Sequence, residues 1–216
     1  MVWALTVFDL ALVQRKSVGW GNPVITHSAK REFVQHGDAA QAFRILDGWV
    51  AGFTILADGR RQVIDLFLPG DVMSSRSSQF VWNIGLLALT TVRVSLISAC
   101  DVNAHLVSSR YNYQTNAIIR LGCLTAYERV AHLFLEIHER SGGRQDTGHA
   151  TFDFPLTQEL MADLLGLSPV HINRTLQQLR RDDLVLLKGG KLCLLDLPKL
   201  KKLSHFVSTA QAPEPI

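Results

Sequence analysis

Short apolar runs separated by glycine-containing turns fill the first half of the chain, from about residue 24 to residue 100. In FRILDGWVAGFTILADGRRQVIDLFLPGDV (43–72), three such runs are separated by Asp47-Gly48, Asp58-Gly59 and Pro69-Gly70-Asp71. An Asp-Gly pair between apolar runs predicts a hairpin, because glycine accepts the positive φ that such turns need. Short strands at this spacing predict a small antiparallel barrel or roll.

Two long apolar stretches need separate interpretation. The stretch at 80–100 is long enough to span a bilayer, but Asn83 and Arg93 lie inside it, and its Val and Thr content favours two buried strands. The apolar start of the chain lacks basic leading residues and is interrupted by Asp9, which favours a structured or frayed N-terminus over a signal peptide. We therefore expect no membrane partner.

The pattern changes from strand to helix at about residue 102. Thr125 and Glu128 bracket TAYE, a capping-box sequence that predicts a helix start. The helix that follows carries Val130, Phe134 and Ile137 on one face, and this helical region extends to about residue 140. Beyond it lies the polar segment SGGRQDTGH, which is the best candidate for a domain boundary. The chain thus divides into residues 1–101, 102–140 and 141–216.

The last segment begins with a short strand, TFDFPL, followed by two helical patterns at about 157–165 and 169–182. LVLLKGGKLCLL then predicts two strands joined at Gly189-Gly190, and the tail STAQAPEPI is expected to be disordered. The whole chain is therefore predicted to be α+β.

The two helices have the spacing of a helix-turn-helix. Ala162 lies four residues before Gly166, and Ile172 lies six residues after it. A small residue allows close crossing, glycine makes the sharp turn, and a branched apolar residue anchors the second helix. The buried faces are predicted to comprise Met161, Leu164 and Leu165 in the first helix and Ile172, Leu176 and Leu179 in the second.

The second helix starts with a strong signal. Ser168 is a good N-cap, and Pro169 stands at the first helical position, where a missing N–H costs nothing. The free amides and positive dipole of this N-terminus suit a phosphate or a groove. The solvent face is predicted to present His171, Asn173, Arg174, Gln177 and Arg181.

Charge placement favours a polyanion partner more clearly than the net charge of +3 does. From Arg174 to Lys202 the chain carries eight basic residues against three acidic ones, a local excess of five positive charges. Lys188 and Lys191 flank the predicted hairpin turn, which would form the wing of a winged helix. Helices, wing and charge together predict binding of double-stranded DNA.

These segments resemble the Crp/Fnr family, named for the cyclic AMP receptor protein and the fumarate–nitrate reduction regulator. The resemblance covers roughly residues 28 to 205 and is most specific in LTQELMADLLGLSPVHINRTLQQLRRDDLV. It implies an N-terminal cyclic-nucleotide-binding-like roll, a long dimerisation helix and a C-terminal winged helix-turn-helix. It also implies a homodimer that binds a palindrome and regulates transcription, with RNA polymerase as a further partner.

Carried over residue by residue, the family's base-reading positions fall on Val170, Asn173 and Arg174. Arg174 matches the family's arginine and is the candidate for a guanine contact through O6 and N7. Val170 departs from the glutamate of many members, and valine can only pack, for instance on a thymine methyl. The complete set of predicted DNA-binding residues is Gln158, Ser168, Pro169, Val170, His171, Asn173, Arg174, Gln177, Arg181, Lys188 and Lys191.

The effector side departs further from the family. Members that bind cyclic nucleotide carry a Gly-Glu-Leu segment and a later arginine pair, whereas here Gly70-Asp71-Val72 and Trp82-Asn83 align with them, and Arg76 lies in an unmatched context. A phosphate without a partner charge is costly to bury, so cyclic AMP is not expected and no cofactor is identified. No cysteine precedes Cys100, which excludes the family's N-terminal iron–sulfur ligands.

The segment between the last roll strand and Gly122 is about a dozen residues short of the family pattern. At about 1.5 Å per residue this corresponds to roughly 18 Å of helix. The remaining dimer seam is predicted to be Ile118, Ile119 and Leu121, in a helix that Gly122 ends. The alternative to a DNA-binding dimer is therefore a degenerate ligand-sensing or protein-interaction module that no longer binds DNA.

Other classes of function have less support. No GxSxG, CxxC, HExxH or phosphate-loop pattern is present, so an enzyme is not expected. The three cysteines are far apart and fit a reducing cytoplasm. His132 and His138 do not share a helix face, so no metal site is predicted.

Overall fold

The computed structural model describes most of the chain. It places residues 23–35, 42–73, 84–97, 104–143 and 148–208. The N-terminal segment, the part beyond residue 208 of the tail for which disorder is predicted, and the positions of Arg76 and Trp82-Asn83 lie outside the described residues.

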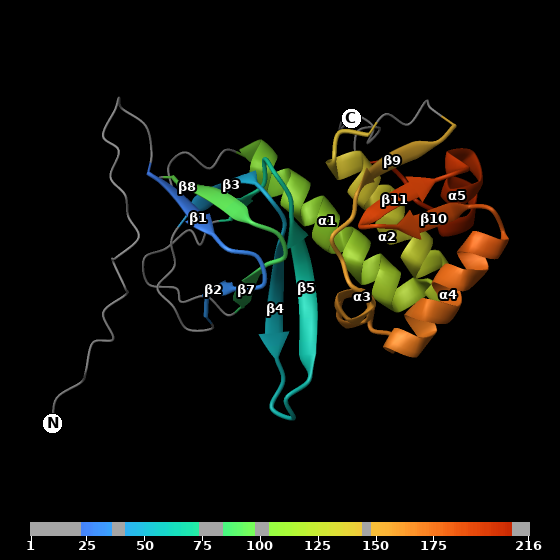
Figure 1. Ribbon diagram of the computed structural model, residues 1–216, viewed down its shortest axis with the longest axis horizontal. Coiled ribbons are helices and arrows are strands. Elements are labelled where there is room, and N and C mark those ends of the chain that lie inside the picture. Colours follow the sequence, from blue (N-terminus) through green and yellow to red (C-terminus); the bar gives the residue numbers. More distant parts are fainter. Residues whose placement is uncertain (1–22, 36–41, 74–83, 98–103, 144–147, 209–216) are drawn as a thin grey trace, which may run out of the picture.

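The N-terminal half forms two four-stranded antiparallel sheets that together make a roll. One sheet has the order β1-β8-β3-β6 and the other β2-β7-β4-β5. Their strands are β1 (Val24–His27), β2 (Glu32–Val34), β3 (Phe43–Asp47), β4 (Val50–Ile55), β5 (Arg61–Phe67), β6 (Val72–Met73), β7 (Gly85–Ala88) and β8 (Val92–Leu96). The predicted roll of an α+β protein is therefore confirmed (Figure 1).

Only one of the three glycine turns closes a hairpin. Asp58-Gly59 joins β4 to its partner β5, whereas Asp47-Gly48 carries the chain from β3 into β4 of the other sheet. The prediction of a hairpin at Asp47-Gly48 is therefore wrong. An Asp-Gly pair indicates a turn with a positive φ, but it does not determine which strand the next strand pairs with. Gly48 has a φ of +84°, and a Cβ there would lie 2.2 Å from the carbonyl oxygen of Thr91.

The long apolar stretch at 80–100 is a pair of strands, β7 and β8, within its described part. Across the described residues, no helix is both long enough and apolar enough to cross a membrane. The interpretation of this stretch as two strands is confirmed.

Two helices follow the roll. α1 (Ala104–Cys123) has 20 residues, which is roughly 30 Å of helix. The shortening of this region relative to the family stays a prediction. α2 (Ala126–Arg140) starts at the predicted capping box: Thr125 N–H donates to the Glu128 carboxylate at 2.8 Å, and Glu128 N–H donates to Thr125 Oγ1 at 3.5 Å. Figure 1 shows α1 crossing from the roll toward the C-terminal helices.

The C-terminal part is a small sheet with three helices. It comprises β9 (Ala150–Asp153), α3 (Gln158–Leu165), α4 (Pro169–Arg181), β10 (Val185–Lys188), β11 (Lys191–Leu194) and α5 (Leu197–Ser204), with the strand order β10-β11-β9. All of these elements were predicted except α5. Asp196 caps α5 by accepting from Lys199 N–H at 2.9 Å, and Asp-Leu-Pro was the signal that the sequence offered.

The C-terminal part and one sheet of the roll share a single apolar core. Phe53 and Val63 of the roll belong to the same buried cluster as Phe134 of α2 and Ile172 of α4. The predicted core residues of α2, α3 and α4 are all buried. Within this core, α3 packs against β5 of the roll, and α2 packs against α3, α4 and α5.

Candidate nucleic-acid interface

The turn between α3 and α4 depends on Gly166. This residue has a left-handed backbone, with φ 63° and ψ 38°, and its N–H donates to the carbonyl oxygen of Ala162. Residues with a side chain avoid this region, which is why glycine ends α3 here. The predicted spacing of a helix-turn-helix is confirmed.

α4 begins as its sequence predicts. Ser168 Oγ accepts from His171 N–H at 3.2 Å, and Pro169 occupies the first turn. Ile172, Leu176 and Leu179 form the buried row, which fixes the rotation of the helix about its own axis. The N-terminus of α4, the positive end of the helix dipole, is thereby presented toward solvent.

The opposite face of α4 is exposed and polar. It carries no carboxylate between Pro169 and Arg181, and Val170 is 61% exposed at its first turn. Asn173 Oδ1 accepts from Gln177 Nε2 at 3.0 Å, so these two amides are held side by side. All of the predicted DNA-binding residues of this helix and its cap are exposed: Ser168, Pro169, Val170, His171, Asn173, Arg174, Gln177 and Arg181.

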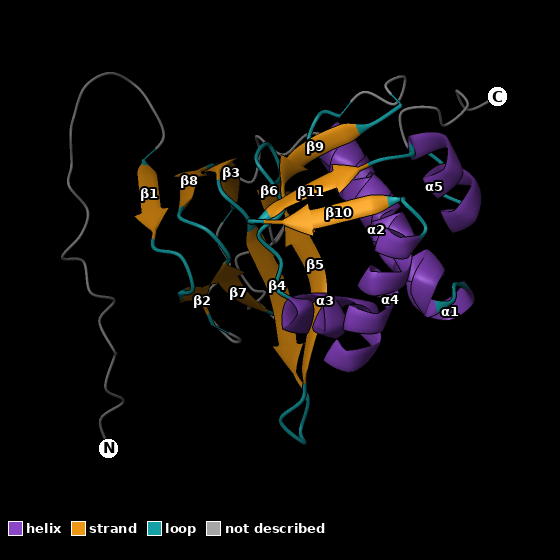
Figure 2. Ribbon diagram, turned by 45° about the vertical axis from the view of Figure 1, so that its right-hand side comes forward, coloured by secondary structure: helices purple, strands orange, loops and turns teal. Residues whose placement is uncertain are grey.

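The other predicted contacts lie on α3 and on the wing. Gln158 is exposed in the first turn of α3. Lys188 and Lys191 face each other across the β10–β11 turn, where Gly189 and Gly190 have φ of 60° and 73°. Figure 2 shows this turn directed toward the roll.

The two wing lysines are not equivalent. Lys191 Nζ lies 2.7 Å from Asp153 Oδ1 on the neighbouring strand β9, and this hydrogen bond raises the pKa of Lys191. Both side chains of this pair are exposed, so the pair itself adds little stability. Asp153 nevertheless offsets part of the positive charge at Lys191, a partner that sequence spacing could not reveal.

Tyr127 on α2 holds the far end of α4. Its hydroxyl donates to the carboxylate of Asp182, the C-cap residue of α4. Partial burial and this hydrogen bond raise the pKa of Tyr127, so the hydroxyl keeps its proton at any physiological pH. The recognition helix candidate is thus tied to α2 through a side chain as well as through its apolar row.

The predicted dimer seam is exposed on α1. Ile118 is 71% exposed, and Ile119 and Leu121 are 40% and 41% exposed. Tyr111, which lies two turns before Ile118 on the same face, is 70% exposed and was not among the residues predicted for the seam. Exposed apolar side chains in a row along one helix are typical of an interface.

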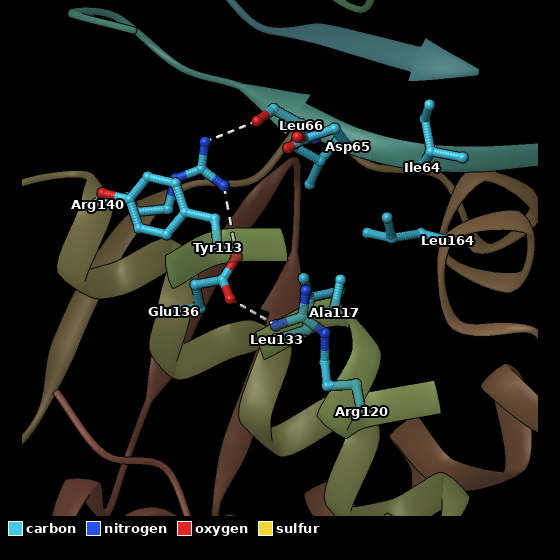
Figure 3. A pocket seen from close by; sticks show the side chains of 10 residues that line it. All are labelled: Ile64, Asp65, Leu66, Tyr113, Ala117, Arg120, Leu133, Glu136, Arg140 and Leu164. Carbon is cyan, nitrogen blue, oxygen red and sulfur yellow. Dashed lines mark hydrogen bonds and ion pairs between the residues drawn. The ribbon is translucent and has the colours of Figure 1, made fainter. Parts of the chain in front are cut away.

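A buried ionic network joins the roll, α1 and α2, and Figure 3 shows the part of it that contains Arg120, Glu136 and Arg140. Arg140 Nη2 lies 2.7 Å from Asp71 Oδ2 and donates to the carbonyl oxygen of Leu66 at 2.6 Å. The Arg140 guanidinium also lies over the ring of Tyr113, with its central carbon 4.1 Å from the ring centroid. Asp71 is therefore engaged within the chain, where it also accepts from Leu68 N–H.

The network continues along α2 toward α1. Arg120 Nη1 lies 2.6 Å from Glu136 Oε2, and Glu136 Oε1 lies 3.4 Å from Arg140 Nη1. Burial raises the pKa of Glu136, but Arg120 and Arg140 more than offset it, so its pKa lies below the usual value. The sequence reasoning missed this network, although the i,i+4 spacing of Glu136 and Arg140 on an otherwise apolar helix was a signal for it.

Comparison with known proteins agrees with this geometry. Residues 128–203 match the family described as the Crp-like helix-turn-helix domain. The chain is 28% identical over 191 residues to the transcriptional activator protein FnrL of Cereibacter sphaeroides. This alignment covers 79% of this chain and 72% of FnrL. It is 26% identical over 175 residues to the nitrogen fixation regulation protein FixK of Rhizobium meliloti, covering 78% and 80% of the two chains.

The fold has solved counterparts as well. The structure of FixK2 from Bradyrhizobium japonicum superposes with a TM-score of 0.73 at 22% identity, covering 87% of this chain and 99% of that one. A CRP/FNR family regulator from Thermus thermophilus superposes with a TM-score of 0.66 at 21% identity, covering 84% and 98%. The curated relatives are regulators, which confirms the prediction of a regulator over an enzyme.

Proposed function

We propose that this chain is a DNA-binding transcription regulator of the Crp/Fnr family and that it binds a palindromic DNA site as a homodimer, because residues 128–203 match the Crp-like helix-turn-helix domain and the relatives named above are regulators. One α4 helix would enter the major groove of each half-site. The observation that carries this proposal is the exposed face of α4. This face is polar, free of carboxylates and preceded by a capped N-terminus, and the buried row holds it in place.

Base reading is assigned to the first two turns of α4. Arg174 supplies the paired donors that match O6 and N7 of guanine, and Val170 packs on a thymine methyl. Asn173 lies between them on the exposed face and reads a base edge. His171 reads an edge or bonds a phosphate.

The remaining predicted residues position the protein on the phosphate backbone without specifying sequence. Gln158 and Ser168 lie at the N-termini of α3 and α4, where backbone amides are also available. Lys188 and Lys191 add contacts from the wing, with Lys188 the stronger because Asp153 competes for Lys191. Gln177 and Arg181 extend the contact along α4.

Dimerisation is assigned to α1. The exposed residues Tyr111, Ile118 and Leu121 follow the heptad spacing of a two-helix seam, and Ile119 flanks it. A parallel pair of α1 helices would relate the two α4 helices by a two-fold axis. A palindromic site, with half-sites about 34 Å apart, matches that symmetry.

The roll is assigned to sensing. An unidentified signal on it would change how the two α4 helices lie relative to each other, and so switch DNA affinity. Because FnrL is named a transcriptional activator, we expect RNA polymerase as a second partner and the cytoplasm as the site of action.

The competing function is a degenerate module that has lost DNA binding. Its motivation was the short dimer segment, but α1 has 20 residues and a row of exposed apolar side chains. The curated relatives carry the names of regulators and lend it no support.

Arg174→Ala tests the proposal. Removing a guanine contact of this kind costs about 1–3 kcal/mol of discrimination, so specific binding should fall roughly 5- to 150-fold. Mobility shifts of genomic DNA fragments measure this, and Arg93→Ala, which removes an exposed arginine of the roll, is the matched control. Unchanged binding by the Arg174 variant would remove the proposed reading residue.

A further inference from the structure

We propose that Arg129 is a positioning residue for DNA recognition. It fixes the orientation of the helix-turn-helix relative to α1. It touches no DNA in this assignment and acts through the backbone of three neighbouring segments. The inference rests on the proposed dimer, because only in a dimer does the direction of α1 set the separation of the two α4 helices.

The guanidinium of Arg129 donates to three carbonyl oxygens from different segments. Nη2 donates to Leu121 in the last turn of α1 at 3.1 Å, and Nε donates to Leu124 in the α1–α2 connection at 2.8 Å. Nη1 donates to Leu165, the last residue of α3, at 3.0 Å. Carbonyls at helix C-termini lack intrahelical partners, and here one side chain satisfies two helix ends at once.

Arginine suits this position better than lysine would. Its planar fork presents several donors in fixed directions, whereas a lysine ammonium is a single point on a flexible stem. The three hydrogen bonds therefore fix the angle between α1 and α3 and do not merely add charge near them.

Direct packing supports the same junction. A Cβ built on Gly166 would lie 3.3 Å from Leu121 Cδ2, so the end of α1 rests against the turn of the helix-turn-helix. Two residues before Arg129, Tyr127 holds the C-cap of α4 through Asp182. The first turn of α2 thus contacts the helix-turn-helix at two points. Arg129 bonds Leu165 at the end of α3, and Tyr127 bonds Asp182 at the end of α4.

Besides Arg129, the buried ion pair of Arg120 with Glu136 holds α1 to α2, and the chain segment that joins the two helices is short. Only Leu124 and Thr125 connect α1 to α2. A change in angle at this connection would swing α4 and alter the separation of the two recognition helices. With Arg129 in place, movement of α1 and movement of the helix-turn-helix are coupled.

The experiment compares wild type with Arg129→Lys and Tyr127→Phe. The DNA probes are a single half-site and inverted repeats whose spacing is varied one base pair at a time, taken from sequences that the wild type selects. Arg93→Lys is the matched control, and thermal unfolding checks that each variant is folded.

We expect both variants to bind the single half-site within about twofold of wild type. Affinity for the best-spaced inverted repeat should fall by about five- to tenfold, a typical size for coupling between sites. The preference among spacings should become flatter, and the effect should be larger for Arg129→Lys because it disturbs three hydrogen bonds.

Two results would overturn the inference alone: an unchanged spacing preference in both variants, or equal losses on half-site and repeat, which would mark a purely structural role. A wild type that binds no inverted repeat would instead overturn the proposed function, and this inference with it.

Discussion

At the scale of single residues, the least expected feature is that α2 buries titratable groups. His132 is 2% exposed and Glu136 is 3% exposed, and both lie on a helix whose neighbours are apolar. Glu136 keeps its charge because Arg120 and Arg140 surround it. Removing one partner of such a buried pair costs about 3–5 kcal/mol, because the other charge is left uncompensated.

His132 makes stability depend on pH. Burial and the neighbouring Arg120 lower its pKa from 6.5 to about 4, and Arg120 Nη1 lies 3.3 Å from its Nδ1. Between these two values the unfolded chain binds more protons than the folded chain, so the free energy of unfolding falls as pH falls. The full loss across this window is about 3 kcal/mol.

Urea unfolding at steps from pH 7 to pH 4.5 measures this slope. In His132→Gln the histidine contribution should vanish and the curve should be flatter, while His149→Gln, at an exposed position, should keep the wild-type slope. An identical slope in all three proteins would contradict the assigned role of His132.

At the scale of elements, prediction succeeded where the signal is local. The capping box at Thr125, the cap at Ser168 and the turn at Gly166 each depend on a few consecutive residues, and each lies where the sequence predicted it. Strand partners depend on the whole sheet, so Asp47-Gly48 indicated a turn correctly and a hairpin wrongly. Long-range contacts such as Tyr127 with Asp182 left no trace in the spacing.

α1 carries the prediction on assembly. In Ile118→Lys, two apolar side chains per dimer lose their burial and two like charges meet, which costs about 3–6 kcal/mol. We expect a monomer in analytical ultracentrifugation at micromolar concentration, where we expect the wild type to be a dimer. Val24→Lys, which replaces an exposed aliphatic residue of β1, is the control.

A wild type that sediments as a strict monomer, without salt-dependent affinity for DNA, would support the degenerate module instead. An Ile118→Lys variant that remains a dimer would leave DNA binding in place but move the seam away from this row of α1.

At the scale of the whole molecule, the roll and the helix-turn-helix are bound together within one chain. Arg61 Nη2 of β5 lies 2.7 Å from Asp163 Oδ2 of α3, and Arg140 ties the end of α2 to Asp71 of the roll. The sequence predicted both parts and their order, but not these bridges. These two ion pairs are the contacts through which the proposed signal on the roll would reach α4, by way of α3 and of α2.

Selection of bound sequences from a random DNA pool tests the central claim most directly. Wild type should enrich an inverted repeat with a guanine in each half-site and centres about 34 Å apart. Val170→Glu should keep the repeat and its spacing but change one base in each half-site. The new base should be cytosine, because its N4 amino group can donate a hydrogen bond to the glutamate carboxylate. Enrichment of no sequence, or of one without an inverted repeat, would contradict a dimer that reads DNA through α4.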